Sequence, residues 1–243
     1  MILLNIKKLL TGILTLIILS ICVYLYVNNK PSVNNIKDVE IGTKTNNNIF
    51  KIVAFGDSLT AGLGVDLKDS YPSILENILN SNPEYKKYDF TFNVINMGVS
   101  GETSSGGLDR VDFVLEQKPD LILMGLGSND MLRNTSPTLV KFNMDTIVQN
   151  ITSSKVPLIL IGMQSVASNG KEYKNDFDAI YPNVANKYSI PLVPFFLEGV
   201  ALEPDLNNAD GIHPNRSGYE KIINENILPV LDVTLRKLID GVY

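Results

Sequence analysis

Three side chains that together can attack an acyl carbon lie near the two ends of this chain. Ser58 lies near the start, and Asp210 and His213, the only histidine, lie near the end. A serine hydroxyl is a weak nucleophile until a base takes its proton, and an imidazole is the usual base. A histidine base needs its far nitrogen held by an acceptor, which Asp210 can supply from three residues away. These residues predict acyl transfer, with Ser58 as nucleophile, His213 as base and Asp210 as its orienting partner.

Attack on an acyl carbon also creates an oxyanion, which requires hydrogen-bond donors that are already in place. The candidate donors are the backbone N–H of Ser58, the backbone N–H of Gly101 and the side-chain amide of Asn129. The alternatives are a simple turn at Gly101 and a helix cap or Asx-turn at Asn129. Because all three residues directly follow predicted strands, we expect them to lie together as an oxyanion hole.

The segment KIVAFGDSLTAG, residues 51–62, indicates how the serine is presented. An apolar strand ends at Gly56, where the chain can turn, and Ser58 then falls in the first turn of a helix. Unpaired N–H groups and the positive end of the helix dipole favour negative charge there. The alternative is an ordinary strand and helix in which Asp57 or Ser58 is only the N-cap.

Apolar runs alternate with helix-length segments over the rest of the chain. Strands that are apolar on both faces and separated by helices are typical of a parallel sheet with helices on both sides. Ligands bind beyond the carboxyl ends of the strands in such sheets, and the candidate site residues all fall there. The predicted strands are 50–55, 92–99, 121–126, 158–163 and 192–196, and the predicted helices are 71–79, 103–117, 138–153, 173–188 and 215–239.

Four sequence blocks together resemble those of the GDSL or SGNH hydrolases, and within them the thioesterase I, arylesterase and lysophospholipase L1 group. The blocks are GDSLTAG at 56–62, VSGETS at 99–104, LGSND at 126–130 and DGIHPN at 210–215. The resemblance implies a flavodoxin-like three-layer α/β/α sandwich with a five-stranded parallel sheet. It also implies Ser58, Asp210 and His213 as the catalytic residues, and Ser58, Gly101 and Asn129 as the oxyanion hole.

Two departures from the family pattern affect the expected site. Ser128 stands where the family often has a second glycine, which predicts a local change in the loop while Asn129 is kept. Val166 and Ala167 stand where prolines are usual, and because prolines stiffen loops we expect a more mobile wall to the acyl pocket.

The N-terminal part of the chain predicts a membrane anchor. Residues 9–27 carry no charge and would span roughly 28 Å as a helix, close to the hydrocarbon thickness of a bilayer. Two lysines precede this stretch and place residues 1–8 inside the cell, so that a polar linker, 28–48, and the hydrolase domain, 49–243, lie outside. The alternatives are a cleaved signal peptide, a lipoprotein processed at Cys22 and a buried core helix.

The composition of the chain indicates which partners and cofactors to expect. The formal net charge of −5 gives no reason to expect nucleic acid as a partner. With a single cysteine, Cys22, and a single histidine, we expect no disulfide, metal or cofactor, and we expect a monomer.

Together these features predict a membrane-anchored serine esterase of the extracytoplasmic side. It would hydrolyse carboxylic esters or thioesters of acyl chains, as arylesterases, lysophospholipases and acyl thioesterases do, through an acyl-serine intermediate. The alternatives are an O-acetyl esterase acting on cell-envelope carbohydrate and a noncatalytic binding protein on a hydrolase fold.

Overall fold

The computed structural model describes residues 48–86 and 90–239. The predicted N-terminus (1–8), membrane span (9–27) and most of the predicted linker (28–47) lie outside the described residues. Among the helices within those two ranges, none is long and apolar enough to cross a membrane. All described residues belong to one compact unit, Asn46–Tyr243.

Strands and helices alternate along most of this unit. The strands are β1 (Ile49–Gly56), β2 (Thr91–Gly98), β3 (Leu121–Gly125), β4 (Leu158–Ile161) and β5 (Leu192–Val193). The helices are α2 (Ser58–Ala61), α3 (Tyr71–Ser81), α4 (Pro83–Lys86), α5 (Ser104–Glu116), α6 (Ser128–Leu132), α7 (Pro137–Ser153), α8 (Lys171–Asp178), α9 (Ile180–Tyr188), α10 (Arg216–Ile222) and α11 (Leu228–Ile239). Shorter turns of 3₁₀ helix cover Leu67–Asp69, Ala167–Asn169 and Pro204–Leu206, and a π-helical turn covers Ile223–Ile227.

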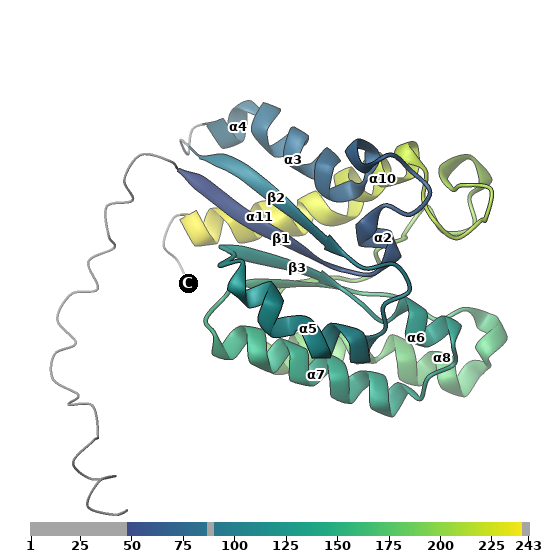
Figure 1. Ribbon diagram of the computed structural model, residues 1–243. Helices are drawn as coiled ribbons and strands as arrows, with labels where there is room; N and C mark the ends of the chain where they lie inside the picture. Colours follow the sequence, from purple (N-terminus) through teal and green to yellow (C-terminus); the bar gives the residue numbers. More distant parts are fainter. Residues whose placement is uncertain (1–47, 87–89, 240–243) are drawn as a thin grey trace, which may run out of the picture. The chain divides into compact units, whose positions relative to one another are not determined.

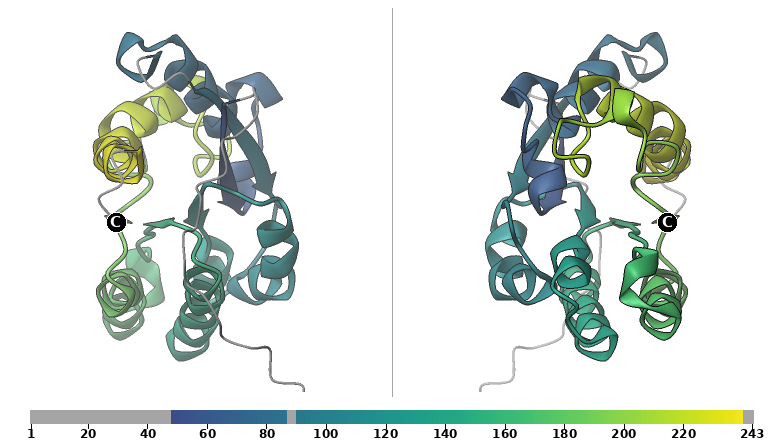
Figure 2. Two further views of the ribbon diagram at one scale, coloured as in Figure 1. Left: turned by 90° about the vertical axis from the view of Figure 1, so that its left-hand side faces the viewer. Right: turned by 90° about the vertical axis from the view of Figure 1, so that its right-hand side faces the viewer.

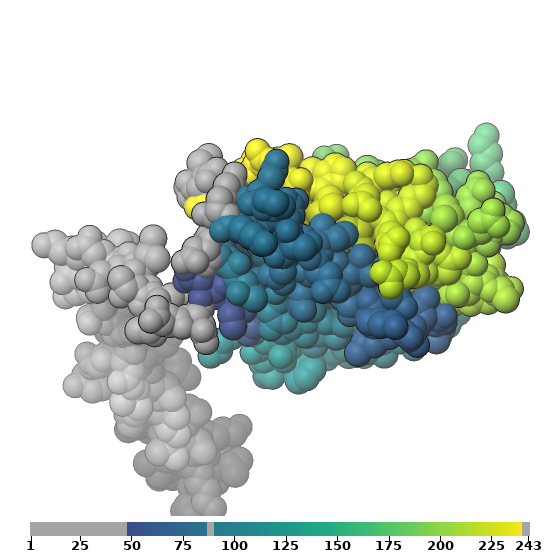
Figure 3. Space-filling view, turned by 90° about the horizontal axis from the view of Figure 1, so that it is seen from above, coloured from purple at the N-terminus to yellow at the C-terminus, as the bar shows by residue number. Residues whose placement is uncertain are grey.

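The five strands form one parallel sheet in the order β2-β1-β3-β4-β5. Helices α3, α10 and α11 cover one face, and α5, α7 and α9 cover the other (Figures 1 and 2). Seen from above, α3 lies beside the C-terminal helices over the first face (Figure 3). The predicted three-layer α/β/α sandwich with a five-stranded parallel sheet is confirmed.

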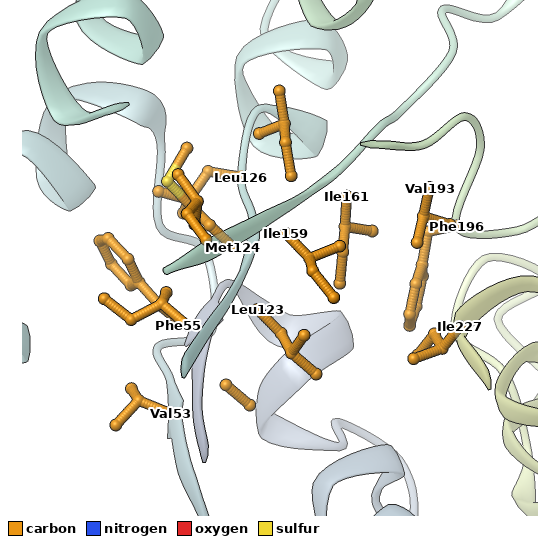
Figure 4. Packing of buried hydrophobic residues seen from close by; sticks show 14 of the residues in the cluster. Val53, Phe55, Leu123, Met124, Leu126, Ile159, Ile161, Val193, Phe196 and Ile227 are labelled. Carbon is orange, nitrogen blue, oxygen red and sulfur yellow. The ribbon is translucent and has the colours of Figure 1, made fainter. Parts of the chain in front are cut away.

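The central strands are buried because helices cover both of their faces. All four residues of β4 are buried, and so are four of the five residues of β3. The successive residues Leu123 and Met124 project from opposite faces of β3 into the two helical layers (Figure 4). Burial on both faces explains why these strands are continuous apolar runs and not alternating patterns.

A proline accounts for each of two differences between the predicted and the observed elements. The helix predicted at 173–188 is two helices, α8 and α9, that meet at Ala179. Pro182 has no N–H to donate to the carbonyl of Asp178, and its ring clashes with that carbonyl in a continuous helix. The strand predicted at 192–196 ends at Val193, because Pro194 cannot continue the ladder of strand hydrogen bonds.

The last predicted helix, 215–239, changes hydrogen-bond register in its middle. The N–H of Leu228 donates to the carbonyl of Ile223, five residues earlier, which is the π-helical pattern. Pro229 follows directly and has no N–H of its own. The wider turn lets the helix pass this proline without a break.

Candidate active site

Ser58, His213 and Asp210 form a continuous hydrogen-bonded chain. The Ser58 Oγ lies 2.9 Å from His213 Nε2, and His213 Nδ1 lies 2.7 Å from the Asp210 Oδ2. An ionised carboxylate can only accept, so Nδ1 carries the proton, and in the neutral ring Nε2 then accepts from the serine hydroxyl. Ser58 is the first residue of α2, just after β1, and Asp210 and His213 lie in the loop after β5. Ser58 and His213 are 155 residues apart in the sequence.

The loop that carries Asp210 and His213 is fixed by its own backbone. One Asp210 carboxylate oxygen accepts from the N–H groups of Ile212 and His213, each at 3.0 Å. These two bonds, followed by the bond to the imidazole, lower the pKa of Asp210 to about 2. Gly211 makes the turn between the two residues with a φ of +74°, which favours glycine. Asp210 is therefore ionised and aimed at His213 at neutral pH.

Helix α10 links this loop to the segment that carries Ser58. Asn215 caps α10 two residues after His213 by accepting from the N–H of Gly218 at 3.0 Å. One turn into that helix, the buried Tyr219 hydroxyl donates to the carbonyl of Leu59 at 3.0 Å. Leu59 is the neighbour of Ser58, so a hydrogen bond between distant segments sets the spacing of serine and histidine.

Asp57 does more than cap the serine's helix. Its buried carboxylate accepts from the N–H of Leu59 at 3.0 Å, as an N-cap does, and also from the hydroxyl of Ser128. The Asn129 amide nitrogen lies 3.5 Å from the same carboxylate. Burial raises the pKa of Asp57, and the bonds from Ser128 and Leu59 oppose that rise. Sequence reasoning found the cap and missed these links to the β3 loop, which no local pattern reveals.

The register of the sheet places the expected oxyanion donors on one edge. Gly56 at the end of β1 pairs with Gly98 on β2 and with Gly125 on β3. Ser58, Gly101 and Asn129 follow these three glycines within a few residues. Gly101 has a φ of +82°, so the turn after β2 depends on glycine.

Arg110 on α5 holds the ends of β1 and β2 together, a role the sequence analysis did not find. Its guanidinium donates to the carbonyls of Gly56 at 3.1 Å and Met97 at 2.8 Å. It also forms an ion pair with the largely buried carboxylate of Glu102, the neighbour of Gly101. A lone arginine on a helix face that buries Val111 and Val114 was the available signal.

A second buried network joins the two loops that carry Gly101 and Asn129. The Asp130 carboxylate accepts from the N–H of Ser104 at 2.6 Å and from its hydroxyl at 2.9 Å. The amide of Asn143 on α7 donates to that hydroxyl at 3.0 Å. These bonds tie α6 to the start of α5 and so fix Asn129 relative to Gly101.

Both departures from the family pattern have a structural counterpart. Ser128 occupies the space beside Asp57 and donates to it. The loop with Val166 and Ala167 is held by hydrogen bonds where prolines would otherwise stiffen it: Asn169 donates to the carbonyl of Met131 at 3.0 Å, and Ser165 N–H donates to Asp178 at 2.7 Å. Within residues 48–86 and 90–239, no group of three His, Cys, Asp or Glu side chains is arranged to hold a metal ion.

The chain is similar in sequence and in structure to known hydrolases. The sequence profile of the GDSL-like lipase/acylhydrolase family matches residues 54–221. Esterase TesA of Pseudomonas aeruginosa is 35% identical over 181 residues, covering 74% of this chain and 87% of TesA. The thioesterase 1/protease 1/lysophospholipase L1 of Escherichia coli is 34% identical, covering 68% of this chain and 76% of that protein. The crystal structure of AlinE4, an SGNH-hydrolase family esterase, is 41% identical with a TM-score of 0.61, covering 75% of this chain and 95% of the other.

Proposed function

The chain belongs to the GDSL-like lipase/acylhydrolase family and is a serine ester hydrolase, and we propose that it releases acyl chains from carboxylic esters or thioesters through an acyl-serine intermediate. We assign Ser58, His213 and Asp210 as its catalytic residues, and Ser58, Gly101 and Asn129 as the donors to the oxyanion. The observation that carries the assignment is the pair of distances within this triad, 2.9 Å from Ser58 to His213 and 2.7 Å from His213 to Asp210.

In the first step, the Ser58 Oγ attacks the carbonyl carbon of the ester while its proton moves to His213 Nε2. The carbonyl oxygen becomes an oxyanion that accepts from the backbone N–H groups of Ser58 and Gly101 and from the Asn129 amide. Collapse of this intermediate breaks the bond to the leaving alcohol or thiol, which takes the proton from His213. The Asp210 carboxylate stabilises the imidazolium that exists between the two proton transfers.

In the second step, His213 takes a proton from water as the water attacks the acyl-serine carbonyl. The second oxyanion occupies the same three donors. Collapse breaks the bond to the Ser58 Oγ, which recovers its proton from His213, and the free acid leaves. No group besides these side chains and water is needed for the balance.

The proposal is tested by hydrolysis of chromogenic 4-nitrophenyl esters from acetyl to palmitoyl by the full chain in detergent. Ser58→Ala is expected to abolish turnover while the unfolding transition stays that of the wild type. Ser105→Ala is the matched control, because Ser105 is an exposed serine on α5. Appreciable turnover by Ser58→Ala would overturn the assignment.

We further propose that residues 9–27 anchor the enzyme in the cell membrane, with residues 1–8 inside and the hydrolase domain from residue 49 on the extracytoplasmic side. Support comes from the uncharged stretch, the preceding lysines and the polar tract that follows. The substrate is then an acyl ester of that compartment, and nucleic acid is not a partner. Protease accessibility of the domain on intact and permeabilised cells tests the orientation.

An O-acetyl esterase acting on cell-envelope carbohydrate is the second candidate, because it would use the same three catalytic residues. Turnover confined to acetyl esters in the same ester series would identify the acetyl esterase.

A further inference from the structure

Exposed apolar side chains gather at the edge of the domain that holds the nucleophile. Of the 12 large hydrophobic residues that are exposed among the described residues, seven lie in segments that follow the carboxyl ends of the strands. At least one of these seven residues follows each strand of the sheet. The right-hand view of Figure 2 looks onto this edge of the domain. We name this set the apolar rim: Leu63, Leu67, Val99, Leu132, Val166, Leu202 and Ile212.

Leu202 is the most exposed member of the rim and is held in place by a built turn. Its side chain is 88% exposed and its φ is +66°, a backbone conformation that favours glycine. The buried Asn207 amide donates to the carbonyl of Val200 at 2.7 Å and to that of Glu203 at 2.8 Å, on either side of Leu202. The exposed Leu202 side chain adds nothing to the packing of the core, so an unfavourable backbone conformation that holds it in solvent indicates a role at the surface.

Two other rim residues are attached directly to the triad segments. Ile212, half-exposed, lies between Asp210 and His213, and its N–H donates to the Asp210 carboxylate. Leu67, 70% exposed, lies in a 3₁₀ turn whose Asp69 accepts from the Arg216 guanidinium at 2.6 Å, just after the histidine loop. Leu67 and Ile212 are therefore tied to the segments that carry the proposed catalytic residues.

We propose that the apolar rim docks on a lipid surface, so that Ser58 meets acyl esters that are embedded in it. This inference rests on the proposed function: the proposed substrates are acyl esters, and acyl esters with long chains partition into lipid. Charges near the rim are mixed, as in the 3.7 Å pair of Lys68 and Asp66, so apolar contact and not attraction to anionic lipid provides the binding.

The length of chain before the domain permits this orientation. β1 begins at the edge of the sheet opposite the rim, and its 8 residues span roughly 26 Å. The 21 residues from 28 to 48 can reach about 70 Å when extended. An anchor at residues 9–27 therefore does not prevent the rim from turning toward the same membrane.

The test places a fluorescent probe on the rim of the full chain in phosphatidylcholine vesicles that contain nitroxide-labelled lipid. Cys22→Ser removes the native cysteine, and Leu202→Cys then carries an environment-sensitive fluorophore. Phe113→Cys is the matched control, since Phe113 is 56% exposed but lies in the last turns of α5, away from the rim. We expect lipid quenching of the probe at 202 and little at 113.

Equal quenching at both positions, or none at 202, would overturn the proposal. A blue shift of the probe at 202 that depends on protein concentration without vesicles would also overturn it, by assigning the rim to a second copy of the chain. Quenching does not depend on catalysis, so its outcome is separate from that of the proposed function.

A kinetic measurement adds a second criterion. Moving one leucine side chain from water into lipid raises the partition coefficient between water and lipid at least about tenfold. Leu202→Asp should therefore lower hydrolysis of a vesicle-borne long-chain ester about tenfold relative to hydrolysis of a water-soluble acetyl ester. Phe113→Asp should leave that ratio unchanged, and an unchanged ratio for Leu202→Asp would contradict docking through the rim.

Discussion

Replacement of Gly56 by alanine tests how tightly the position of Ser58, the proposed nucleophile, depends on the end of β1. A Cβ at Gly56 would lie 2.1 Å from the Thr60 hydroxyl oxygen on α2 and 2.5 Å from the carbonyl oxygen of Gly125. Ordinary contact begins near 3.4 Å, and the Thr60 Cβ would lie at 3.0 Å, so the end of β1 must shift by up to about 1 Å relative to Gly125 and α2. Ser58 follows that strand end by two residues. A misplacement of about 1 Å costs on the order of a hundredfold in rate, and overpacking costs about 1–3 kcal/mol of stability.

Gly125→Ala is the matched control, because Gly125 is the register partner of Gly56 on β3. A Cβ there would meet Ile161 at 3.5 Å, which is ordinary van der Waals contact. We expect kcat/KM for a 4-nitrophenyl ester to fall about a hundredfold in Gly56→Ala and to change less than about threefold in Gly125→Ala. Urea unfolding should show the stability loss only in the first variant. Wild-type activity in Gly56→Ala, or equal losses in both, would refute the reasoning.

Two further predictions concern the carboxylates that orient the site. Asp210→Asn should lower kcat about a thousandfold or more, because the imidazolium loses its partner. The pKa of Asp210 in the folded protein, about 2, lies below the ordinary value of 3.8. The ionised carboxylate therefore stabilises the fold above pH 3.8, and this stabilisation is lost as the pH falls through 2. Because the Asp210 side chain is 44% exposed, solvent screening limits the stabilisation to about 1 kcal/mol. Urea titrations at pH 4 and pH 2 should show the wild type's advantage over Asp210→Asn shrinking, and an advantage that grows would contradict the sign. Asp130→Ala should cost about 3 kcal/mol in urea unfolding, because it leaves the buried Ser104 N–H and hydroxyl without their acceptor; a loss under about 1 kcal/mol would show that the network is not needed.

Much of the fold could be predicted because its determinants are local. Apolar runs gave the central strands to within one or two residues, since burial on both faces leaves a continuous pattern. The ends of elements depend on single residues whose effect is positional. Pro182 and Pro194 were visible in the sequence, but the break at Ala179 and the early end of β5 follow from where their missing N–H groups fall in the ladders.

Some residues of the site could likewise be predicted from the sequence, and others could not. Ser58, Asp210 and His213 were selected by residue chemistry and short spacing, and the structure brings them within hydrogen-bonding distance. The residues that hold them act across long sequence separations. Tyr219 reaches Leu59 over 160 residues and Asp57 reaches Ser128 over 71, and neither partner carries a local pattern that points to the other.

The central claim is that Ser58 is the nucleophile, and trapping of the covalent adduct tests it most directly. The full chain is incubated with an alkyl fluorophosphonate, digested and analysed by mass spectrometry. We predict one phosphonylated site, Ser58, within residues 51–62, and no adduct in Ser58→Ala. An adduct on another serine, or equal labelling of the Ser58→Ala protein, would contradict the account.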